Sequence, residues 1–326
     1  MNKWIDLHID TLQFIVDDGV DPLTPTPTVH VDLPRLKQAG VIASVWTAWV
    51  DQILLGPSAT ARALTMMRAG QTMVERSDGE LKTILTPADL GEIIHSESSG
   101  VIFAMEGASP LLGSLELLEA FFDLGLRVLT LTWNHDNEFA TGCKLTGGKD
   151  IGLTDAGFKL IERLQAKGIV VDLAHASPRT LRDALTCLNR PFMVSHTNCR
   201  QLHDHIRNLT DEEVALISRG GGIIGISIYP GFMVGENEIA TTKTVADHIE
   251  HAVAIAGDDA VAIGTDFDGI TSLPADINGV EDLPRIAAEL ERRGWSQQRI
   301  EKIAWRNAAR LIGDAMTPPD IDESEE

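Results

Sequence analysis

The chain alternates short apolar runs rich in Val and Ile with longer segments whose apolar residues recur at helical spacing. Continuous apolar runs are typical of parallel strands that are buried on both faces, and the helical segments supply the crossovers that such strands need. The pattern therefore predicts an α/β fold, a (β/α)₈ TIM barrel with insertions. Eight runs qualify as strands: Trp4 to Ile9, Val41 to Trp49, Val101 to Met105, Arg127 to Leu131, Ile169 to Leu173, Phe192 to Ser195, Ile223 to Ile228 and Val261 to Gly264.

The predicted helices lie between these strands, and some carry start signals. Ser177-Pro178 places a proline just inside a helix, and Thr210 with Glu213 makes a capping box. The amphipathic segments are Ala59 to Glu75, Gly113 to Leu124, Thr154 to Lys167, Pro178 to Leu188, Asp211 to Arg219 and Thr244 to Ala256. We expect one barrel domain over residues 1–316, followed by an acidic, Pro-containing and disordered tail over residues 317–326.

Charge and composition exclude several classes of partner. A formal net charge of -21 repels phosphate backbones, so we expect no nucleic-acid partner. The first apolar stretch is interrupted by Asp6, His8 and Asp10, which is unlike the core of a signal peptide. No apolar run is long enough to span a membrane. Three scattered cysteines do not make a disulfide framework. The expected location is cytoplasmic, with no membrane partner.

Residues of metal-ligating type stand at the ends of five predicted strands. Side chains two apart in a strand share a face, so His8 and Asp10 could bind one ion together. Barrel active sites collect at the carboxyl ends of the strands, where all of these residues would meet. The set is His8 and Asp10 on the first strand, Glu106 on the third, His175 on the fifth, His196 on the sixth and Asp266 after the last.

Three histidines and several carboxylates exceed what one four-coordinate zinc needs, so they suggest a two-metal site. Glu106 would bridge the ions, with His8 and Asp10 completing one metal and His175 and His196 completing the other. A hydroxide shared by the ions would be the nucleophile, and Asp266 would handle the proton.

Structural roles are the competing interpretation of these polar residues. A strand-end histidine such as His175 could donate to a neighbouring carbonyl group, and Asp172 or Asp268 could be a cap or a turn residue. Cys199 is expected to be a buried structural thiol. The histidines expected at the surface are His30, His95, His203, His205, His248 and His251.

These motifs resemble the membrane dipeptidase (renal dipeptidase) family of zinc peptidases, and in particular a bacterial-type cytoplasmic member. The similarity runs from residue 5 to about residue 310, in the order of the family. The matching segments are Ile5-Asp6-Leu7-His8-Ile9-Asp10, Met105-Glu106-Gly107, Leu129-Thr130-Leu131-Thr132, Val171-Asp172-Leu173-Ala174-His175, Val194-Ser195-His196 and Gly264-Thr265-Asp266-Phe267-Asp268-Gly269.

The resemblance implies a binuclear zinc barrel that hydrolyses dipeptides, often including those with a D-configured C-terminal residue. It implies an acid/base role for Asp266. The zinc ligands that it implies are His8, Asp10, Glu106, His175 and His196. Arg207 falls where the family has an arginine that holds the substrate carboxylate, a role that suits a guanidinium fork. Tyr229 resembles a further pocket position, although packing alone would also explain it.

One segment departs from the family pattern. After Leu-Thr-Leu-Thr the animal enzymes carry a histidine that supports the oxyanion, whereas this chain has Trp133. Either His135 or Asn134 could supply the missing donor through a changed loop. Trp133 and Asn134, like Asp266, are also expected to contact the substrate. The residue that contacts the reacting oxygen and the preferred dipeptide therefore stay open.

Three interpretations of function remain. The first is a cytoplasmic dipeptidase with two Zn²⁺ or other divalent transition-metal ions and a small dipeptide as its substrate. The second is another metal-dependent amidohydrolase, such as a lactonase, phosphotriesterase or deaminase; the absence of a lysine from Arg127 to Thr132 disfavours the phosphotriesterase type of bridge. The third is a catalytically inactive metal-binding or peptide-binding barrel. The family is commonly dimeric, so a homodimer is also open.

Overall fold

A computed structural model describes residues 3–317 and contains nine β-strands in that range. All nine belong to one parallel sheet. The strands are β1 (Trp4–Ile9), β2 (Val41–Trp49), β3 (Leu81–Thr83), β4 (Ser99–Glu106), β5 (Leu126–Thr130), β6 (Val170–Asp172), β7 (Met193–Thr197), β8 (Ile223–Ile226) and β9 (Val261–Ile263).

Eight of the strands close into a barrel. β1 pairs with β2 on one side and with β9 on the other, and a β2–β4 pairing completes the ring through β5, β6, β7 and β8. The (β/α)₈ fold predicted from the sequence is confirmed. β3 is additional: it pairs with the first half of β4, and β5 pairs with the second half. The sequence does not predict β3, because three residues with an exposed Lys82 in the middle make no apolar run.

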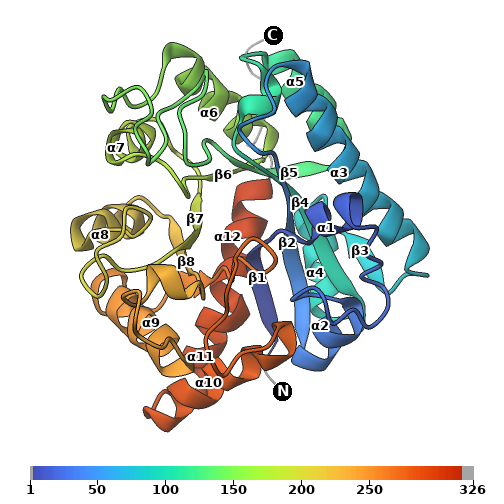
Figure 1. Ribbon diagram of the computed structural model, residues 1–326, viewed down its shortest axis with the longest axis vertical. Helices are drawn as coiled ribbons and strands as arrows, with labels where there is room; N and C mark the ends of the chain where they lie inside the picture. Colours follow the sequence, from blue (N-terminus) through green and yellow to red (C-terminus); the bar gives the residue numbers. More distant parts are fainter. Residues whose placement is uncertain (1–2, 318–326) are drawn as a thin grey trace, which may run out of the picture.

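Helices surround the ring of strands (Figure 1). The six predicted helices are present, and the Ser177 cap and the Thr210/Glu213 capping box form as expected. The helices are α1 (Thr11–Asp17), α2 (Leu33–Ala39), α3 (Pro57–Arg76), α4 (Pro87–Ile94), α5 (Leu115–Asp123), α6 (Asp155–Lys167), α7 (Pro178–Leu185), α8 (Asp211–Arg219), α9 (Thr242–Ala256), α10 (Leu283–Arg292), α11 (Gln297–Glu301) and α12 (Asn307–Met316), with a π-helical turn over Lys302–Arg306.

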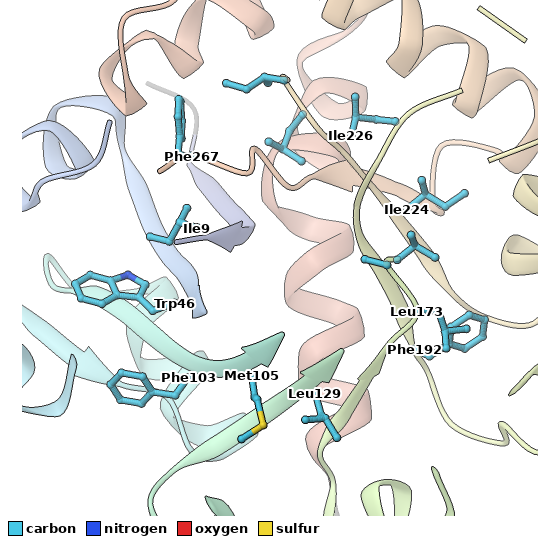
Figure 2. Close-up of a cluster of buried hydrophobic side chains, with 14 of the residues drawn as sticks. Ile9, Trp46, Phe103, Met105, Leu129, Leu173, Phe192, Ile224, Ile226 and Phe267 are labelled. Atoms are coloured by element: carbon cyan, nitrogen blue, oxygen red, sulfur yellow. The ribbon is translucent and has the colours of Figure 1, made fainter. Parts of the chain in front are cut away.

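The strands bury both faces, which explains their continuous apolar runs. In β4, Phe103 and Met105 belong to the outer hydrophobic cluster, whereas Ile102 and Ala104 belong to the inner one. Figure 2 shows side chains of the outer cluster, such as Trp46, spread around the ring of strands. The inner cluster fills the barrel, so the fold offers no open channel at its centre.

The amino-terminal end of the barrel is covered by α12. This helix (Figure 1) contacts β1, β6, β8 and β9. Its Leu311 and Ile312 belong to the inner cluster. At its first residue, the Asn307 side chain donates to the carbonyl of Val261, where β9 begins. The carboxyl ends of the strands are therefore the end at which loops can build a site.

Two further expectations concern the tail and the membrane. Apart from Thr317, the predicted acidic tail lies outside the described residues. Within residues 3–317, no helix has both the length and the apolar character needed to cross a bilayer.

Candidate active site

The structure brings the strand-end residues together at the carboxyl end of the barrel. His8 lies in β1 and Asp10 directly follows it, and the His8 Nε2 atom is 3.2 Å from Asp10 Oδ2. Glu106, the last residue of β4, places its Oε1 atom 3.8 Å from the same nitrogen. These three buried side chains form the first ligand cluster.

A second ligand cluster shares Glu106 with the first. His175, three residues after β6, has its Nε2 atom 2.8 Å from Glu106 Oε1. The Nε2 atom of His196, in β7, is 3.5 Å from the same oxygen and 2.9 Å from His175 Nε2. One carboxylate thus stands between two sets of possible metal ligands.

Asp266 completes the polar floor of the site. Its Oδ1 atom lies 4.0 Å from His8 Nε2, and its backbone N–H donates to the carbonyl of His8. Asp266 and His175 both have positive φ angles, 68° and 62°, a conformation that is costly for non-glycine residues and that concentrates at functional sites. Burial raises the pKa of Asp266 to about 7, although the neighbouring His8 charge opposes this shift.

Buried hydrogen bonds orient two of the histidines. Ser195 Oγ donates its proton to Asp172 Oδ2 at 2.7 Å, so it accepts from His196 Nδ1 at 2.9 Å. His175 Nδ1 is 2.9 Å from Asn134 Oδ1. His196 therefore carries its proton on Nδ1 and presents an unprotonated Nε2 to the cluster, as in metal-ligating histidines, and the Asn134 oxygen is an acceptor that can hold His175 in the same tautomer. The expected alternative for His175, donation to a backbone carbonyl, is not what the structure has.

Asp172 accepts several of the buried hydrogen bonds beneath the ligand histidines. It is fully buried and accepts from the Thr130 and Ser195 hydroxyls and from the backbone N–H groups of Ala174 and Ser195. It therefore ties β5, β6 and β7 together just below the histidines. The sequence suggests at most a cap or turn role for Asp172.

The donor set fits divalent cations. Asp10 Oδ1 is buried without a hydrogen-bond partner among the described residues, and His8 Nε2 has the Asp10 Oδ2 oxygen as its nearest carboxylate atom, at 3.2 Å and without hydrogen-bond geometry; this is costly unless another ligand satisfies these atoms. The His175 and His196 lone pairs also face each other at 2.9 Å, so a cation near both would relieve their repulsion. Burial lowers the pKa of both histidines well below the usual value, which keeps them neutral. Burial disfavours a charge on His8, but the Asp10 and Glu106 carboxylates outweigh it and raise its pKa to about 10.

A cavity of about 560 Å³ opens onto this cluster. Arg207, Tyr229, Trp133 and Asn134, the residues proposed from the sequence as substrate contacts, all line it together with Asp266. The Arg207 guanidinium is buried; it donates to the His196 carbonyl at 3.1 Å, its Nε has no partner, and no ion pair joins it to a carboxylate of residues 3–317.

His135 does not line the main cavity. It lines a second, neighbouring hollow of about 310 Å³, and its Nδ1 atom is buried without a partner among residues 3–317. Trp133 lines both hollows, with its ring 5.8 Å from the His135 ring and 6.2 Å from the His175 ring. Of the two candidate donors after the Leu-Thr-Leu-Thr segment, only Asn134 lines the main cavity.

Other members of the site are not predicted from the sequence. Lining the main cavity as well are Trp49, Lys144, His205 and Phe232. The position of Trp49 at the end of β2 is a signal that could have identified it.

Two histidines expected at the surface lie deeper. His205 is half-buried, and the prediction that His248 lies at the surface is wrong. His248 is 1% exposed and accepts from the backbone N–H of Cys199, which is itself buried as expected.

Comparisons with known proteins agree with this geometry. A family model described as membrane dipeptidase (peptidase family M19) matches residues 2–320. A metallopeptidase from Rhodobacter sphaeroides, solved with a phosphinate mimic of the dipeptide L-Ala-D-Ala, is 25% identical; the match covers 96% of this chain and 99% of that chain, with a TM-score of 0.89. The structure described as the metallopeptidase dipeptidase AC, of family M19, is 26% identical over 97% of this chain and 99% of that chain, with a TM-score of 0.90.

A more distant structure shares the fold. The probable dipeptidase PvdM from Pseudomonas aeruginosa is 20% identical, with coverage of 98% of this chain and 96% of that chain and a TM-score of 0.87.

Because the family model spans nearly the whole sequence and the strand-end residues converge as its motifs imply, the chain belongs to the membrane dipeptidase family.

Proposed function

We propose that the protein is a metallo-dipeptidase with a two-metal site that hydrolyses free dipeptides. The observation that carries the proposal is the position of Glu106, one buried carboxylate shared by two ligand clusters at the base of a substrate-sized cavity. Family membership supports hydrolysis of dipeptides, and a metallopeptidase of similar fold supports the use of metal.

In this proposal, His8 and Asp10 would hold one ion, His175 and His196 would hold the other, and Glu106 would contribute to both. Mixed imidazole and carboxylate ligands suit Zn²⁺, and they also suit other divalent transition metals. When bound, such ions lower the pKa of water toward neutrality and polarise a substrate carbonyl.

Arg207 selects substrates with a free carboxylate. Its buried guanidinium lines the cavity and forms no ion pair with a carboxylate of residues 3–317, so the carboxylate of a dipeptide would supply a direct counter-charge. Truncating such a charged, hydrogen-bonded pair weakens binding strongly, because the remaining charge stays buried and unpaired. Tyr229 and Trp133 line the same cavity and would contact the substrate side chains.

Asp266 moves the proton. It takes a proton from the attacking water and passes it to the amine of the leaving residue, which is general base and then general acid catalysis. Its position beside His8 and its exposure to the cavity support this role, because they put the carboxylate between the ligand clusters and the substrate.

The proposed substrates include dipeptides with a C-terminal D-residue, because the similar Rhodobacter sphaeroides metallopeptidase was solved with a phosphinate mimic of L-Ala-D-Ala. The cytoplasmic location and the homodimer stay predictions from the sequence.

The test is hydrolysis of L-Ala-L-Ala and L-Ala-D-Ala before and after removal of metal by a chelator. We expect cleavage that disappears on chelation and returns with added Zn²⁺. Asp266→Asn should retain bound metal and lose turnover, which separates its role in proton transfer from metal binding. If the metal-loaded protein cleaves lactones or other amides but neither dipeptide, the site is that of a different hydrolase.

A further inference from the structure

Asn134 stands between a metal-ligand histidine and the substrate cavity. Its side-chain Oδ1 is 2.9 Å from His175 Nδ1 and also accepts from the Cys143 thiol at 3.3 Å. The residue itself lines the main cavity. One end of this amide is therefore engaged with protein groups, and the other end is left to act on a ligand.

The orientation of the amide follows from the histidine. His175 Nε2 faces the cluster, 2.8 Å from Glu106 Oε1 and 2.9 Å from His196 Nε2, so this nitrogen must be unprotonated to bind a cation. The proton then lies on Nδ1, which needs an acceptor. Only the oxygen of Asn134 can serve, so the NH₂ group has to be the free end.

That NH₂ group has no hydrogen-bond partner among residues 3–317, whereas the rest of Asn134 is fixed. The backbone N–H of Lys144 donates to the Asn134 carbonyl at 2.8 Å. Gly142 packs so closely that a Cβ atom there would lie 2.7 Å from the same carbonyl oxygen. A donor held in place before substrate binds is the arrangement that stabilises developing negative charge most effectively.

The alternative donor is less well placed. His135 lines the neighbouring hollow and not the main cavity. Trp133 also lines the main cavity and offers an indole N–H, but no hydrogen bond to residues 3–317 holds its side chain in place, in contrast to the Asn134 amide. Asn134 is thus the candidate of the Trp133-Asn134-His135 segment that both lines the main cavity and touches a metal-ligand side chain.

We infer that Asn134 has two roles at the proposed dipeptidase site: its Oδ1 positions His175 for metal, and its NH₂ group donates to the oxygen of the scissile carbonyl as that oxygen becomes negative. The inference rests on the proposed function. It assigns to an amide side chain the role that the family gives to the histidine replaced by Trp133.

The two roles can be separated with two substitutions. Asn134→Asp keeps an acceptor for His175 but loses the donor, and Asn134→Ala loses both. With saturating Zn²⁺, both variants should lose about 100-fold or more in kcat for L-Ala-D-Ala, the usual effect of removing one donor to a developing oxyanion. Only Asn134→Ala should also lose metal affinity, by about 10- to 100-fold in competition with a chelator.

The exposed Asn237 provides the matched control, since the same two substitutions there should change neither property. A phosphinate analogue of L-Ala-D-Ala supplies a further readout: its affinity should fall in both Asn134 variants by more than KM rises, because the donor acts on the transition state. Wild-type kcat in Asn134→Asp would overturn the donor role. A loss in His135→Gln equal to that in Asn134→Ala would assign the donor to His135 instead.

Failure of the proposed function would look different. If the wild-type protein cleaved no dipeptide, the chelator competition would still test the positioning role of Asn134. Unchanged metal affinity in Asn134→Ala would overturn that role whatever the substrate.

Discussion

Gly269 lies against two carboxylates of the site, so its substitution tests the site through side-chain contacts alone. A Cβ atom at this position would lie 2.2 Å from Asp10 Oδ2 and 2.6 Å from Asp266 Oδ1. Both contacts are with the ends of side chains, so Gly269→Ala can be accommodated by moving the carboxylates. Restoring van der Waals separation needs a shift of about 1 Å, and misplacement on this scale costs about 100-fold in rate.

The fold should tolerate the change, because the displaced atoms are terminal groups and not backbone. We expect a loss of about 1 to 2 kcal/mol in the free energy of unfolding, typical of one extra methyl group in a packed site. The combined expectation for Gly269→Ala is a loss of about 100-fold in kcat/KM for a dipeptide, with a thermal unfolding midpoint that falls by only a few degrees.

The assay pairs dipeptide hydrolysis at saturating Zn²⁺ with thermal unfolding of the same sample. Gly91→Ala is the matched control, because a Cβ atom at this exposed glycine of α4 meets no atom within 4 Å. It should leave hydrolysis unchanged. Wild-type hydrolysis by Gly269→Ala would refute the view that Asp10 and Asp266 must hold these positions, and complete unfolding would show that the clash is not local.

Three further buried groups, Asp172, Arg207 and His248, each give a prediction. Asp172→Ala leaves four buried donors without an acceptor, so the free energy of unfolding should fall by at least about 4 kcal/mol. Urea unfolding of the metal-free protein measures this loss, and an unchanged midpoint would contradict the role assigned to Asp172. Arg207→Met should lower kcat/KM for dipeptides by about 100-fold or more while leaving cleavage of the corresponding dipeptide amides little changed; equal losses for both substrates would show that Arg207 does not bind the carboxylate. Burial lowers the pKa of His248 to about 4, so as the pH falls the unfolded chain binds a proton at this histidine before the folded protein does. The free energy of unfolding should therefore be unaffected above about pH 6.5 and should fall by about 3 kcal/mol in total as the pH drops to 4. His248→Gln, which keeps an acceptor for Cys199, should weaken this pH dependence of urea unfolding, and an identical profile would exclude His248 as its source.

Periodicity and strand position predict much of this molecule from the sequence. Buried parallel strands need apolar side chains on both faces, so the eight barrel strands stand out as continuous runs. Their carboxyl ends must meet, which is why the sequence alone brings His8, Glu106 and His196 to one place. β3 carries no such signal, since it is a three-residue strand beside the barrel and not a member of it.

The supporting layer of the site is harder to predict, because it depends on contacts between loops and neighbouring strands. Nothing in the pattern around Asp172 shows that its carboxylate accepts from β5 and β7, and nothing around Asn134 shows that its oxygen meets His175. The surface prediction for His248 is wrong for a similar reason: the helical pattern does not show that the loop carrying Cys199 packs against this histidine.

The most direct test of the central claim is a titration of metal into chelated protein, with bound Zn²⁺ counted by elemental analysis and L-Ala-D-Ala hydrolysis followed at each point. We predict that hydrolysis rises to a break at two ions per chain, and that Glu106→Gln weakens both binding events because Glu106 contacts both ions. Full activity at one ion per chain, or two bound ions with no cleavage of any dipeptide, would contradict the two-metal dipeptidase site.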